Sequence, residues 1–90
     1  MAIFAVIPTP VQAVPKLEAA IVRHFAQSFV KIDGSGGWLI SANQTAQGLS
    51  DFLGITDGSN GSAIVIEVAS YFGRANPNIW TWIKLYWGAR

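Results

Sequence analysis

The fold of this chain is decided by its last third, which reads Ala63-Ile64-Val65-Ile66-Glu67-Val68-Ala69 and then, after a bend, Asn76-Pro77-Asn78-Ile79-Trp80-Thr81-Trp82-Ile83-Lys84. The first run is apolar and rich in β-branched residues, which predicts a strand over 63–69. The second run starts as helices do, because Asn accepts from free amides of the first turn and Pro at the first position loses no hydrogen bond. We therefore expect a strand, a bend and a capped helix.

The terminal helix carries more apolar surface than one packed face needs. At 100° per residue its apolar side chains cover an arc of roughly 220°, about twice the usual width. Trp and Tyr are also the side chains that most often anchor interfaces. We predict that this helix docks on a second chain through Trp80, Trp82, Tyr86 and Trp87. The alternative is that the helix lies in a groove of its own sheet.

The upstream sequence adds two helices and three strands. We expect a buried strand over 2–7 ended by Pro8, a helix from Pro15 to about Ala26, strands over 28–32 and 38–42 joined by a glycine-rich connection, and a helix capped by Asn43 or Thr45 and ended at Gly54. The order βαββαβ with an added C-terminal helix predicts one α+β domain over 1–90, a ferredoxin-like sandwich. Its antiparallel sheet has strand order 4-1-3-2 and both inner helices on one face.

Composition limits the classes of function. Hydrophobic residues make up 51% of the chain and charged residues 12%, about half the usual charged fraction, which favours self-association. The net charge of +1 comes from scattered basic residues, so generic binding along duplex phosphates is not expected. The absence of cysteine rules out disulfides and thiolate metal sites, and no apolar run approaches the roughly 18 residues of a membrane span. We predict a cytoplasmic protein without a membrane partner.

As a pattern, a 90-residue βαββαβ unit with a C-terminal extension resembles the Cas2 and VapD-like small ferredoxin-fold proteins of bacteria and phages. In that family an Asp ends the first strand and, paired across a dimer, is proposed to place a metal for phosphodiester cleavage. The corresponding stretch here, Val6-Ile7-Pro8-Thr9, has no carboxylate. The resemblance therefore implies dimerisation more than nuclease activity.

Candidate polar sites are few. Tyr71, Arg74 and Asn76 combine a stacking ring, a guanidinium and a helix start, which suits a phosphate or carboxylate; the alternative is an ordinary helix cap beside a surface arginine. His24 falls on the apolar stripe of the first helix and is interpreted as a residue at the boundary of the core. Glu67 is expected to face solvent or a sheet edge. No catalytic set, metal site or cofactor is predicted.

The function expected from these features is binding without catalysis. We predict a homodimeric interaction module of the kind found among phage or bacterial accessory and counter-defence proteins. The alternatives are a nucleotide or single-stranded nucleic-acid binder that uses Tyr71 and Arg74, and a Cas2-like metal-dependent nuclease.

Overall fold

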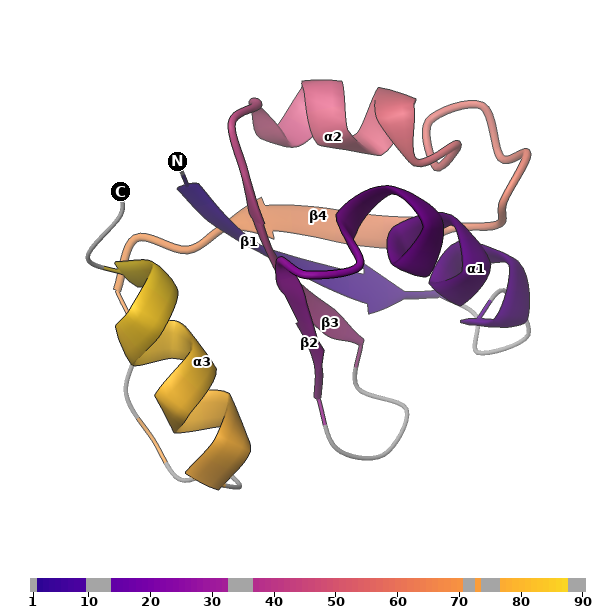
Figure 1. The fold of residues 1–90 in the computed structure, drawn as a ribbon. Coiled ribbons are helices and arrows are strands. Elements are labelled where there is room, and N and C mark those ends of the chain that lie inside the picture. Colours follow the sequence, from indigo (N-terminus) through magenta and orange to yellow (C-terminus); the bar gives the residue numbers. More distant parts are fainter. Residues whose placement is uncertain (1, 10–13, 33–36, 71–72, 74–76, 88–90) are drawn as a thin grey trace.

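The computed structural model describes residues 2–9, 14–32, 37–70, 73 and 77–87 of the chain. The elements are β1 (Ala2–Pro8), α1 (Val14–Phe25), β2 (Phe29–Lys31), β3 (Trp38–Ala42), α2 (Ala46–Phe52), β4 (Ala63–Glu67) and α3 (Pro77–Trp87) (Figure 1). Every predicted element is present in the predicted order, with β2 and β4 two residues shorter than expected. The architecture is α+β, as predicted.

The four strands form one sheet in the order β2-β3-β1-β4, with antiparallel neighbours throughout. Read from β4, this is the predicted order 4-1-3-2, and the apolar β1 is central as expected. Pro8 does not end β1 but belongs to it and pairs with Ala63. The β1–β3 pairing ends at Val6 and Trp38, so the missing N–H of Pro8 removes no bond to β3.

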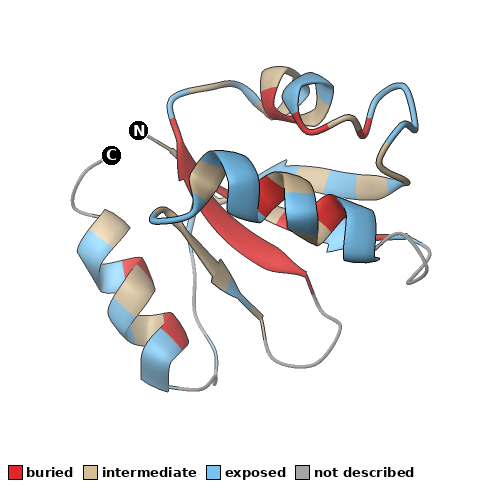
Figure 2. Cartoon of the chain, turned by 45° about the vertical axis from the view of Figure 1, so that its right-hand side comes forward, coloured by how far each residue is buried: buried red, intermediate tan, exposed pale blue. Residues whose placement is uncertain are grey.

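The main core lies between the sheet and the two helices on one of its faces, α1 and α2 (Figures 1 and 2). The amphipathic pattern of each helix explains its position, since the apolar stripe points at the sheet and the polar side at solvent. The side chains that are at most 1% exposed in this core are Phe4, Val6, Leu17, Ile21, Trp38, Ile40, Leu49 and Leu53.

A smaller core lies on the opposite face, where α3 packs across β1 and β2. Ile79 and Ile83 of α3 are buried there with Ile3 and Leu39 of the sheet. The terminal helix therefore covers part of its own sheet, which was the alternative to docking on a second chain.

Helix α2 is fixed at both ends by local hydrogen bonds. Of the two predicted caps, Thr45 is the one used: its side-chain oxygen accepts from the Gly48 N–H at 3.0 Å. At the other end Gly54 has a positive φ of 74°, and the Ile55 N–H donates to the Ser50 carbonyl at 3.0 Å. This is a Schellman-type ending, in which glycine has no Cβ to strain the left-handed backbone.

We expect Thr45→Ala to lower the free energy of unfolding by about 1 kcal/mol, because the Gly48 amide would lose its acceptor. Urea denaturation would measure this loss. Thr45→Ser, which keeps the hydroxyl, serves as the control and should change stability by less than half as much. Equal losses in the two variants would show that the hydroxyl does not act as a cap.

Candidate functional site

The sequence-predicted anion site lies outside the described residues. Tyr71, Arg74 and Asn76 are not among the residues that the structure describes, so their grouping into one site stays a prediction. Gly73, between them, has a φ of 142°, a backbone conformation that side-chain-bearing residues rarely adopt.

The four aromatic residues predicted as an interface are half-buried in the smaller core of their own chain. Trp80, Trp82, Tyr86 and Trp87 all pack against that core. The Trp82 and Tyr86 rings lie 4.7 Å apart between centroids, and the Tyr86 hydroxyl donates to the Gln27 carbonyl. Much of the apolar arc is thus used within one chain, and the strongly exposed apolar residue of α3 is Leu85, at 70%.

A second exposed apolar surface lies on the sheet, over the part of the α3 face nearest β4. Ile64 and Ile66 of β4 are 51% and 47% exposed, and Ile7 of β1 is 36% exposed. Ile64 pairs with Ile7, and Ile66 pairs with Ala5, which packs against the smaller core. Directly paired residues share a face, so the three isoleucines lie together; we call them the β4 patch.

The β4 patch borders an edge of the sheet at which no described strand pairs with β4. The Val68 N–H donates to the Ile3 carbonyl, and the Ser62 carbonyl accepts from the Thr9 N–H. In an antiparallel ladder the groups alternate in direction, so the even-numbered residues of β4 bond to β1. Ala63, Val65 and Glu67 therefore direct their N–H and C=O groups away from the sheet, and no strand of the described chain pairs with them.

The other sheet edge is built differently. β2 has three residues, and its Lys31 Nζ lies 3.4 Å from the Glu18 carboxylate of α1. Short strands and lysines are how natural proteins protect an edge from pairing. β4 is longer, and its one charge is Glu67, which is exposed on this edge strand as predicted. Of the two edges, β4 is the one suited to pairing.

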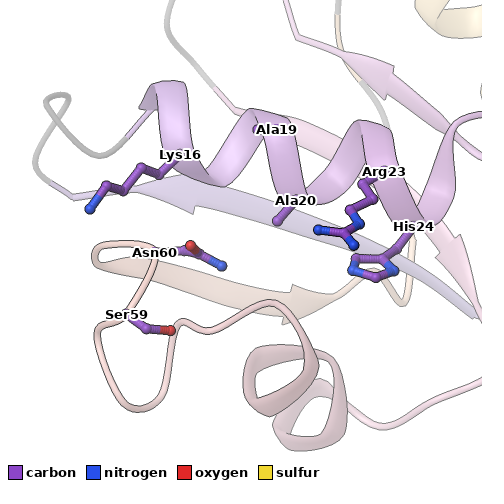
Figure 3. A pocket seen from close by; sticks show the side chains of 7 residues that line it. All are labelled: Lys16, Ala19, Ala20, Arg23, His24, Ser59 and Asn60. Atoms are coloured by element: carbon purple, nitrogen blue, oxygen red, sulfur yellow. The ribbon is translucent and has the colours of Figure 1, made fainter.

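A cleft opens on the helical side, between α1 and the loop that joins α2 to β4 (Figure 3). Its volume is about 370 Å³. We call it the α1 cleft. It is lined by Lys16, Ala19, Ala20, Arg23, His24, Ser59 and Asn60.

The loop side of the α1 cleft is held in place by hydrogen bonds. Asn60 donates from its side-chain nitrogen to the Leu53 carbonyl at 2.7 Å and from its backbone N–H to the Gly54 carbonyl at 2.9 Å. The Ser59 N–H donates to the Asp57 carboxylate at 2.9 Å. This bond is the main reason that the pKa of Asp57 lies below its usual value, since it favours the charged form. Ser59 and Asn60 are thus fixed opposite α1.

The structure corrects the interpretation of His24. Its side chain is exposed at the cleft, and its ring meets that of Phe52 edge-on, with 4.7 Å between centroids. His24 does lie next to the apolar stripe of α1, but on the side of the helix that faces solvent. The spacing of Lys16, Arg23 and His24 on one helix is the signal in the sequence that could have indicated one side of the cleft. The sequence did not indicate that the loop carrying Ser59 and Asn60 forms the other side.

The described residues contain neither a candidate metal site nor a helix that could span a membrane. No group of three or more His, Cys, Asp or Glu side chains is placed to hold a metal ion. Among the helices of this part of the chain, none has the length and apolar character needed to cross a membrane.

Comparison with known proteins found no similar protein. No known protein family matches the chain, and searches of the curated proteins and of the solved structures also found no match.

Proposed function

We propose that this chain is a non-catalytic interaction module that acts as a homodimer, with two copies joined through β4. The observation that carries the proposal is the β4 patch, in which half-exposed isoleucines border a strand edge with free hydrogen-bonding groups. Large apolar side chains exposed beside an unpaired edge favour association over isolation in water.

A second copy satisfies this edge in full. When two β4 strands run antiparallel around a two-fold axis at Val65, each outward-facing residue meets another: Val65 pairs with the partner's Val65, and Ala63 with the partner's Glu67. Each such pair exchanges two backbone hydrogen bonds. Such an isologous contact is the commonest way in which proteins form dimers.

The same register also matches side chains. Ile64 of one copy lies opposite the partner's Ile66, so the two β4 patches join into one apolar surface. Glu67 faces the partner's Ala63 and not a second carboxylate, which avoids repulsion between like charges. The chain's net charge of +1 adds little opposition to pairing.

The fold assignment and the family resemblance belong to the same proposal. The strand order and the position of α1 and α2 on one face support a ferredoxin-like sandwich. A resemblance to the Cas2 and VapD-like proteins implies dimerisation, and it stays a prediction. The end of β1, Val6-Ile7-Pro8-Thr9, carries no carboxylate for metal-dependent cleavage.

Light scattering coupled to size exclusion tests the proposal. We expect twice the chain mass of 9.7 kDa for the unmodified protein and the mass of one chain for Ile64→Lys/Ile66→Lys. Four ammonium groups would meet in the joined patch, so the dimer should weaken at least about 100-fold, since juxtaposed like charges cost several kcal/mol. Both side chains are half exposed, so the variant should still fold.

Leu85→Lys is the matched control, because it places the same charge on the exposed apolar residue of α3. It should leave the dimer intact; dissociation by this variant would instead assign the interface to α3. Hydrogen exchange adds a residue-level check. The Val65 amide should be protected in the dimer only, whereas the Ile64 and Ile66 amides bond to β1 and should be protected in both states. A monomeric unmodified protein at about 100 μM would refute the proposal.

A further inference from the structure

We propose that the α1 cleft binds a small phosphorylated ligand, a nucleoside diphosphate by its chemistry. This inference concerns the helical side of the sheet and is independent of pairing through β4. It rests on the charges that line the cleft, on their spacing, and on the rings beside them.

The cleft concentrates positive charge. Lys16 and Arg23 both line it from α1, and no acidic side chain is among its lining residues. Neither Lys16 nor Arg23 has an ion-pair partner within the described ranges of the chain, whereas Lys31 on the neighbouring strand pairs with Glu18. A hollow lined by charges of one sign focuses the electric field and attracts the opposite charge.

The spacing of the cations favours a ligand longer than one phosphate. Lys16 and Arg23 are seven residues apart, so their backbone positions on the helix are separated by roughly 10 Å at about 1.5 Å per residue. Figure 3 shows Lys16 toward one end of the cleft and Arg23 toward the other, with Ser59 and Asn60 on the facing loop. A diphosphate is shorter than this separation, so the long Lys16 and Arg23 side chains must both turn inward to meet it, with the Arg23 fork on one phosphate and the Lys16 ammonium on the other.

The wall between these ends allows close approach. Ala19 and Ala20 line the helical side of the cleft with small side chains, and Asn60 is held on the loop side by its bonds to the Leu53 and Gly54 carbonyls. One N–H of the Asn60 side-chain amide donates to the Leu53 carbonyl, and its side-chain oxygen can accept from a ligand hydroxyl, as a ribose would offer.

Aromatic rings lie at the Arg23 end of the cleft. Phe52 is 50% exposed, and it is held by edge contacts with His24 at 4.7 Å and Phe25 at 5.8 Å between ring centroids. Stacking of a base on such a ring requires no hydrogen-bond readout and accepts any base. Cations for a diphosphate thus line the cleft, and a ring for a base lies beside it, against the lining residue His24. This combination points to the ligand class.

Nuclear magnetic resonance titration with ADP at low salt tests the site. We expect the backbone signals of residues 16–24 and 59–60 to shift, and the affinity to fall at least about tenfold in Lys16→Gln and in Arg23→Gln, because each removes a charge-assisted hydrogen bond. Both side chains are exposed, so folding should be unaffected, and the dispersion of the spectrum verifies it. Lys84→Gln, on α3, is the matched control and should bind ADP as the unmodified protein does.

Pyrophosphate separates the two parts of the ligand. Phe52→Leu should weaken ADP several-fold and leave pyrophosphate unchanged. Three results would overturn the inference: no shifts with millimolar ADP, an equal loss in Lys84→Gln, or shifts centred on residues outside the cleft. Pyrophosphate bound as tightly as ADP would refute the nucleoside part of the ligand.

Discussion

Gly37→Ala is expected to destabilise the domain by at least about 3 kcal/mol, a large share of the roughly 5–15 kcal/mol that holds a domain of this size folded. Gly37 is buried immediately before β3 and has a φ of 111°. A Cβ built there would lie 2.1 Å from the Val6 carbonyl oxygen. That oxygen belongs to the backbone of the central strand, so neither atom can move without disturbing the β1–β3 pairing.

Gly58→Ala is the matched control, because it separates backbone strain from the steric clash. Gly58 has a positive φ of 77°, but a Cβ there would meet nothing within 4 Å. Its substitution should cost only the 1–2 kcal/mol or so of a left-handed backbone. Urea denaturation followed by tryptophan fluorescence measures both variants, with the buried Trp38 as reporter. If Gly37→Ala lost no more stability than Gly58→Ala, close approach of the two strands would not be the reason for glycine at position 37.

Ile83→Ala is expected to lower the free energy of unfolding by about 2–4 kcal/mol, since it opens a cavity in the smaller core. Ile83 is 7% exposed and packs in the cluster that joins α3 to Ile3 and Leu39. Because α3 and the sheet form one unit, the loss of stability should appear in the single unfolding transition of the whole domain. Calorimetry or urea denaturation provides the measurement.

Leu85→Ala supplies the comparison within the same helix. Leu85 is 70% exposed, and Leu and Ala have similar helix propensities, so its substitution should change stability by no more than about 0.5 kcal/mol. Equal effects at positions 83 and 85 would mean that α3 does not pack on its own sheet in solution. The aromatic surface predicted from the sequence would then be free for a partner chain.

The sequence determined the succession of elements and the pairing of the strands. The strand in the apolar run over 2–7 and the turns in 56–62 each have a local physical cause, because β-branched residues favour extended backbone and glycine permits left-handed turns. The Thr45 cap and the end of α2 at Gly54 could also be predicted from the sequence, because both depend on local backbone geometry. The observed strand order is β2-β3-β1-β4, and few topologies connect such elements with short loops.

Only the tertiary structure decided which apolar surface is covered. Periodicity showed that α3 has excess aromatic surface, but whether a neighbour covers it depends on how the helix lies across the sheet, which is a contact between residues distant in sequence. Ile64 and Ile66 proved to be half exposed, although they lie in a strand whose continuous apolar run is typical of a buried one. His24 shows the same limit: its place on the stripe was predictable, but the loop carrying Asn60 that makes it part of a cleft was not.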